Sequence, residues 1–225
     1  MRRTFEIGGK TVFVFHSNRP GSPVIYLNTY SDEMQKIYEA VQATGCPPFT
    51  LVTVSNLAWN HDMAPWDSPA AFKKGEPFIG GADNYLQLLV EEIIPRAEKE
   101  LAEPPVWRGI AGYSLAGLFA LYAIYRTDVF SRVGCMSGSL WFPGFKEYIF
   151  SHEPKRRPDC IYFSLGDKEA KTRNSVLKTV QENTEEIQAF YQSKGIDTVF
   201  QLNPGNHFVQ GIERTISGIQ WLLRR

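Results

Sequence analysis

The stretch Val106-Trp-Arg-Gly-Ile-Ala-Gly-Tyr-Ser-Leu-Ala-Gly-Leu-Phe-Ala-Leu-Tyr-Ala123 decides the fold, because its hydrophobic pattern changes sharply near the middle. Residues 106–111 form a β-rich run, and residues 115–123 form an uninterrupted apolar run of helical character. Between them, residues 112–114 leave room only for a tight turn. The stretch therefore predicts a buried strand that turns directly into a buried helix.

The same alternation of short apolar runs and helical stretches continues on both sides. Strands are predicted over residues 4–7, 11–15, 24–27, 49–55, 106–111, 132–136, 160–165 and 198–202. Helices are predicted over residues 34–44, 83–101 with a kink or a division at Pro95, 115–123, 175–193 and 212–223. Strands that alternate with helices indicate βαβ units and a mainly parallel sheet.

The first two strands differ from the rest because Gly8-Gly9-Lys10 between them is a turn signal, which predicts an antiparallel hairpin. We therefore predict an α/β fold, with a mostly parallel sheet of about eight strands and helices on both faces in three layers. One domain is expected over residues 1–225. The long aromatic stretch from 56 to 82 is expected to be a functional loop.

The charge and the cysteine content exclude several classes of function. Lys and Arg together number 24, and so do Asp and Glu, so the formal net charge is zero. The chain therefore has no excess positive charge that would favour binding to nucleic acid or to an anionic membrane. No apolar run has membrane-spanning length, and no secretory h-region follows the basic start. The three cysteines lack metal-site spacing. We expect a cytoplasmic enzyme without metal or cofactor, whose partner is a small molecule; the sequence does not fix its oligomeric state.

Ser114 is the candidate nucleophile. A serine hydroxyl needs a neighbouring base and a sharp strand-to-helix turn that lifts its Oγ above the sheet, with small flanking residues. Gly112-Tyr113-Ser114-Leu115-Ala116 fits this G-x-S-x-G pattern with alanine in place of the second glycine. The strand before it and the helix after it supply the context that the pattern requires.

The base and the acid are sought after Ser114, because their order along the chain is nucleophile, acid, histidine. His152 and His207 are the two histidines that follow, and His207 is favoured because it comes after the last strand and before the terminal helix. Glu169 and Asp167 both follow the strand at 160–165, and either could orient the base. Their spacing favours Glu169, with Asp167 as the alternative acid.

The oxyanion hole and the pocket are predicted from topology. Backbone N–H groups of Leu115 and of Thr29 or Tyr30, in the loop 28–31, are expected to bind the developing negative charge. Three tryptophans at the carboxyl ends of strands are the candidate substrate-binding residues: Trp59, Trp66 and Trp141. Ordinary loop packing is the alternative role for these aromatic side chains.

The chain resembles the esterase branch of the α/β-hydrolases that includes enterochelin (ferric siderophore) esterases and esterase D. The matching stretches are Gly112-Tyr-Ser-Leu-Ala-Gly-Leu-Phe-Ala-Leu121, Ser137-Gly-Ser-Leu-Trp-Phe142, Gly166-Asp-Lys-Glu169 and Pro204-Gly-Asn-His207, with Gly80-Gly-Ala-Asp-Asn-Tyr-Leu86 and Glu91-Glu-Ile-Ile-Pro95 before them. The resemblance implies Ser114, His207 and Glu169 or Asp167 as the catalytic set. Where esterase D relatives typically carry His-Gly, this chain has Asn28-Thr29.

The function predicted first is hydrolysis of a carboxylic ester through an acyl-enzyme on Ser114, with His207 as general base. An aromatic-acyl or siderophore-type ester is the expected substrate class. An acyltransferase using the same triad is the second hypothesis. The third is a hydrolase-like binding protein without activity.

Overall fold

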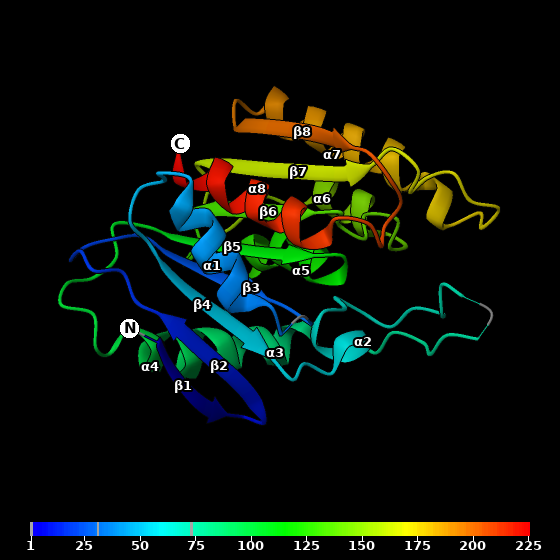
Figure 1. Cartoon of the computed structure of the whole chain (residues 1–225). Coiled ribbons are helices and arrows are strands. Elements are labelled where there is room, and N and C mark those ends of the chain that lie inside the picture. The colour runs from blue at the N-terminus through cyan, green and yellow to red at the C-terminus, as the bar shows by residue number, and fades with distance from the viewer. Residues whose placement is uncertain (1, 31, 73) are drawn as a thin grey trace.

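The computed structural model describes residues 2–30, 32–72 and 74–225. Eight strands in this part form one sheet in the order β1-β2-β4-β3-β5-β6-β7-β8 (Figure 1). They are β1 Arg2–Ile7, β2 Lys10–Phe15, β3 Val24–Asn28, β4 Thr50–Ser55, β5 Arg108–Tyr113, β6 Arg132–Met136, β7 Cys160–Gly166 and β8 Asp197–Asn203. β2 pairs antiparallel with β1 and β4, and the other pairings are parallel. The predicted mostly parallel sheet with its N-terminal hairpin is confirmed.

Helices cover both faces of this sheet. Their bounds are α1 Met34–Ala43, α2 Trp59–Asp62, α3 Ala82–Leu88, the π-helical turn η1 Leu89–Ile93, α4 Ile94–Glu98, α5 Leu115–Arg126, α6 Phe145–Ser151, the 3₁₀ turn η2 Leu177–Thr179, α7 Val180–Ser193 and α8 Gly211–Leu223. In Figure 1, α1 and α8 lie on the near face, where they pack against each other and α8 covers β5, β6 and β7. Helices α5 and α7 cover the opposite face.

The burial of the central elements explains why their sequences are apolar throughout. All residues of β3 and β7 are buried, as expected for parallel strands covered on both faces. Residues 115–125 of α5 are also all buried, so this helix is hydrophobic on every side. The strand–turn–helix predicted around residue 114 therefore forms the centre of the fold.

The structure agrees with the division expected at Pro95 and adds two short helices. The helix expected over 83–101 is divided into α3, η1 and α4, and the π-helical turn stands just before Pro95, whose ring and missing N–H disturb the regular ladder. The short helices α2 and α6 were not predicted. Within the described residues, no helix combines the length and apolar character needed to cross a bilayer.

Candidate active site

Ser114 stands on a strained turn between β5 and α5. Its φ of 62° and ψ of −125° place a non-glycine residue in a region that side chains disfavour. Backbone hydrogen bonds hold it there: its N–H donates to the Met136 carbonyl at 3.0 Å, and its carbonyl accepts from the N–H groups of Gly117 and Ser139 at 3.0 and 3.1 Å. Conformational strain sustained by its surroundings is the expected property of a nucleophile turn.

His207 reaches Ser114 from the loop between β8 and α8. The two side chains lie in hydrogen-bond contact, with 2.9 Å between His207 Nε2 and Ser114 Oγ. The hydroxyl of Tyr113 donates to the backbone carbonyl of His207 at 2.7 Å, so the residue before the serine also fixes the histidine. His152, in contrast, bonds to Ser151 and to the carbonyl of Tyr148 around the end of α6.

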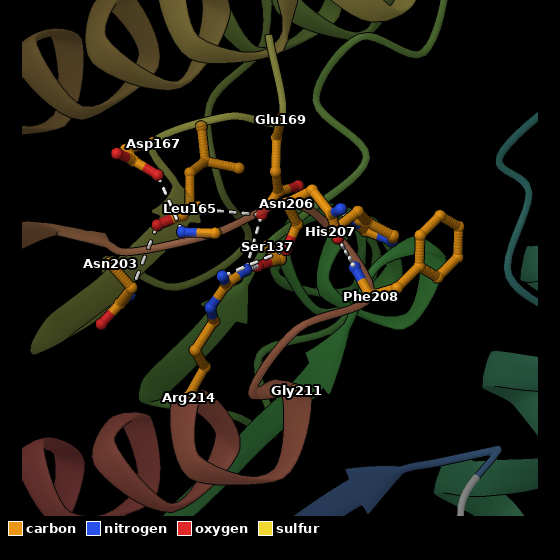
Figure 2. A network of polar contacts seen from close by, with 12 residues as sticks. Ser137, Leu165, Asp167, Glu169, Asn203, Asn206, His207, Phe208, Gly211 and Arg214 are labelled. Atoms are coloured by element: carbon orange, nitrogen blue, oxygen red, sulfur yellow. Dashed lines mark hydrogen bonds and ion pairs between the residues drawn. The ribbon is translucent and has the colours of Figure 1, made fainter. Parts of the chain in front are cut away.

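Glu169, and not Asp167, contacts the histidine. Glu169 Oε2 lies 2.7 Å from His207 Nδ1, whereas Asp167 Oδ1 accepts from the backbone N–H of Gly205 at 2.8 Å. Burial raises the pKa of the Glu169 carboxyl, but the hydrogen bond and charge of His207, with the N–H of Gly166, lower it, and the net shift is downward. Figure 2 shows Asp167 directed toward the turn at Asn203, away from His207.

Arg214 is a residue of this site that sequence reasoning missed. It lies in the first turns of α8 with only 1% of its side chain exposed, and its Nη1 donates to Glu169 Oε1 at 2.8 Å. Figure 2 shows the guanidinium beside Glu169 and Ser137. Its spacing in the sequence could have indicated its burial. Arg214, Gly218 and Leu222 follow each other at intervals of four residues, which places the arginine on the buried face of the helix.

The predicted oxyanion donors differ in availability. Leu115 is the first residue of α5, where N–H groups have no acceptor within the helix and the helix dipole favours negative charge. The N–H of Thr29 donates to the carbonyl of Val54 at 3.0 Å, so it is already used in the sheet. Tyr30 follows with its side chain 84% exposed. Ser31, at the end of the predicted loop, lies outside the described residues.

The three candidate tryptophans have separate environments. Trp66 packs against the rings of Phe142, Phe145 and Tyr148 and donates from Nε1 to the carbonyl of Pro143, which is the role of a packing residue. Trp59 meets the ring of Tyr30 edge-on, with 5.7 Å between centroids. Trp141 packs against Phe78 and Phe142, two residues beyond Ser139.

The described residues contain no group of three or more His, Cys, Asp or Glu side chains arranged to hold a metal ion. Cys135 and Cys160 are buried free thiols, and burial raises the pKa of both. They pack in the core as small apolar side chains.

Comparison with known proteins adds the family. The model of the esterase family described as "Putative esterase" matches residues 11–215. The chain belongs to this esterase family. The matched range runs from β2 into α8 and includes Ser114, Glu169 and His207. The prediction of a carboxylic-ester hydrolase of the α/β-hydrolase fold is thereby confirmed.

Individual relatives of this esterase are distant in sequence. The uncharacterized protein YbbA of Bacillus subtilis (strain 168) is 21% identical over 92% of this chain and 88% of its own length. The crystal structure of an IroE-like serine hydrolase from Shewanella oneidensis is 18% identical, with a TM-score of 0.82 over 100% of this chain and 80% of that one. The siderophore hydrolase EstA of Aspergillus nidulans is 16% identical, with a TM-score of 0.77 over 99% and 94%. At these identities the structures establish the shared fold.

Proposed function

We propose that this esterase cleaves its substrate through an acyl-enzyme on Ser114. His207 Nε2 takes the proton of the Ser114 hydroxyl as Oγ attacks the ester carbonyl, and the tetrahedral intermediate collapses as the same proton passes to the departing alkoxide. Water then attacks the acyl-enzyme, with His207 again as the base, and releases the acid. Glu169 holds the imidazole in the required tautomer and stabilises the imidazolium.

One observation carries the proposal: an unbroken chain of contacts from Ser114 Oγ to His207 Nε2 at 2.9 Å and from His207 Nδ1 to Glu169 Oε2 at 2.7 Å. Both distances are within the reach required for proton transfer. The carboxylate is 4% exposed and the imidazole 28% exposed, so the acid is shielded while the base remains open to a substrate.

Negative charge on the attacked carbonyl oxygen is bound by two backbone N–H groups in this proposal, those of Leu115 and Tyr30. The start of α5 supports Leu115, because a helix N-terminus favours an anion. Tyr30 replaces Thr29 as the second donor, because the Thr29 N–H already donates to Val54.

The substrate class that we propose is a small ester, either an aromatic-acyl ester or an ester of the siderophore type. Two exposed aromatic residues follow segments of the site along the chain: Phe208, 87% exposed, comes directly after His207, and Tyr30, 84% exposed, comes shortly after β3. Flat rings at these positions offer stacking surfaces for an aromatic acid. The description of the Aspergillus nidulans relative as a siderophore hydrolase supports the siderophore-type ester.

The test is ester hydrolysis by wild-type protein and by Ser114→Ala, with p-nitrophenyl acetate and an aromatic-acyl ester as substrates. Ser114→Ala should lose turnover of both. Ser131→Ala is the matched control, because Ser131 is also a buried serine but precedes β6 at the other end of the sheet, and it should retain activity. Undiminished turnover in Ser114→Ala would exclude this mechanism.

Labelling by a fluorophosphonate identifies the reacting atom independently. Ser139 Oγ lies only 3.4 Å from Ser114 Oγ, so the labelled peptide must be assigned by mass spectrometry. Modification at Ser114 is expected. Absence of labelling would favour a binding protein, and transfer of the acyl group to an added alcohol in preference to water would favour an acyltransferase.

A further inference from the structure

Arg214 is a buried cation whose hydrogen bonds reach Glu169 and the segments around Ser114 and His207. Its Nη1 donates to Glu169 Oε1 at 2.8 Å, to Ser137 Oγ at 3.0 Å and to the Tyr113 hydroxyl at 3.2 Å. Its Nη2 donates to the carbonyls of Pro204 and Asn206, both at 3.1 Å. Burying a guanidinium is costly unless it is paired and hydrogen-bonded, so these five contacts define its place in the structure.

Two of these contacts tie down the loop that holds the base. Pro204 and Asn206 precede His207, and Figure 2 shows the guanidinium between this loop and Glu169. Asn206 Oδ1 in turn accepts from the N–H of Phe208 at 2.9 Å. Arg214 therefore fixes the backbone on the amino side of the histidine, while Tyr113 fixes the carbonyl of the histidine itself.

The two oxygens of the Glu169 carboxylate serve three partners. Glu169 offers Oε2 to His207, while its Oε1 accepts from Arg214 and from the N–H of Gly166 at 2.6 Å. With its side chain 4% exposed, this anion has little water to offset its charge. An unopposed carboxylate here would hold a proton on the adjacent imidazole, and a protonated imidazole cannot accept one from Ser114.

Other titratable groups around the guanidinium are few in the described part of the chain. Tyr113 lies above it on β5, Tyr162 beside it on β7, and Asp167 near the Gly205 turn. Burial raises the pKa of Tyr113 and of Tyr162, so both remain uncharged at neutral pH. Glu169 is thus the carboxylate that Arg214 contacts directly.

We propose that Arg214 is a positioning residue for this reaction: it offsets the charge of Glu169, so that the imidazole of His207 remains free to accept the proton of Ser114. The inference rests on the proposed function of Ser114, His207 and Glu169. It assigns to α8 a part in catalysis that involves no contact with the substrate.

The test is the pH dependence of kcat/KM for Arg214→Gln and Arg214→Lys, whose acid limb reports protonation of the base in the free enzyme. Arg214→Gln removes a positive charge near the imidazole, so its acid limb should move to higher pH by about one unit. Arg214→Lys retains a cation, so its acid limb should stay near that of wild type although kcat falls. A purely structural role would lower activity in both variants without moving the limb, and that result would overturn the inference.

Arg132→Gln is the matched control. Arg132 is a part-buried arginine at the start of β6 that donates to the Leu222 carbonyl near the end of α8, remote from His207. Its loss should leave the acid limb in place. Ser114→Ala distinguishes failure of the proposed function from failure of the role of Arg214. If Ser114→Ala remains active, the proposed function fails. If Ser114→Ala is inactive and the acid limb of Arg214→Gln does not move, only the role of Arg214 is refuted.

A second comparison applies if Arg214→Gln does not fold because it leaves a buried carboxylate unpaired. Glu169→Gln retains an oxygen that can accept from Arg214, and Glu169→Gln/Arg214→Gln places two neutral amides in the same space. The pH dependence of fluorophosphonate labelling at Ser114 then isolates the arginine charge. Labelling should require a higher pH in the double variant than in Glu169→Gln, and coincident profiles would refute the inference.

Discussion

Gly112→Ala tests whether the nucleophile turn depends on close backbone contact. A Cβ at residue 112 would lie 2.3 Å from the carbonyl carbon of Ala116, 2.4 Å from its oxygen and 2.5 Å from its Cβ. Ordinary contact begins near 3.4 Å, so the end of β5 and the start of α5 must separate by about 1 Å. Such overpacking costs about 1–3 kcal/mol. Because Ser114 lies between the two elements, a shift of this size should lower kcat about 100-fold.

The assay combines thermal unfolding with kcat for p-nitrophenyl acetate, and Gly134→Ala is the control. On the neighbouring strand β6, a Cβ at residue 134 would lie 3.1 Å from Ala111 Cβ and from Met136 Sδ, and 3.3 Å from Leu222 Cδ1. These contacts involve side chains, some of them flexible, so the control should lose less stability and keep its kcat. Wild-type Tm and kcat in Gly112→Ala would show that the contact with Ala116 does not set the position of the serine.

Three further predictions concern the acid, the tryptophan loop and acid stability. Glu169→Gln should lower kcat by about 10²–10⁴-fold, whereas Asp167→Asn, which affects only the contact with Gly205, should lower kcat by less than tenfold; equal losses in the two variants would contradict the assignment. Trp66→Ala should reduce the free energy of unfolding by about 3–5 kcal/mol in urea titrations, because it removes a ring packed on four others, and a change confined to KM would instead make Trp66 a substrate contact. Since the pKa of Glu169 is lowered in the folded state, its stabilisation is complete above the unfolded-state pKa of about 4.3 and is lost as the pH falls through the folded-state pKa. The urea midpoint of wild type should therefore fall more steeply below about pH 4 than that of Glu169→Gln, and parallel curves would refute the linkage.

The turn at Ser114, the position of His207 in its loop and the succession of strands along the chain could be predicted because each leaves a local pattern in the sequence. The turn at Ser114 is bounded by a strand and an apolar helix, and His207 is the histidine that follows the last strand. The choice between Glu169 and Asp167 could not be settled in this way. Both follow β7 within three residues, and the one that meets the imidazole depends on how the turn directs each side chain.

The role of Arg214 was hidden because an arginine in an amphipathic helix normally faces solvent. Its burial depends on partners from three other segments, Tyr113, Ser137 and Glu169, which come together only in the folded sheet. The short helices α2 and α6 were missed for a related reason, since tertiary packing decides such short elements.

The backbone conformation of Ser114 suits the proposed catalysis but lowers the stability of the fold. Its left-handed φ would suit glycine, and holding any larger residue there costs about 1–3 kcal/mol. Ser114→Gly should therefore yield a protein that resists heat better than the wild type and hydrolyses nothing. Unchanged heat resistance in Ser114→Gly would show that this backbone conformation costs the fold nothing.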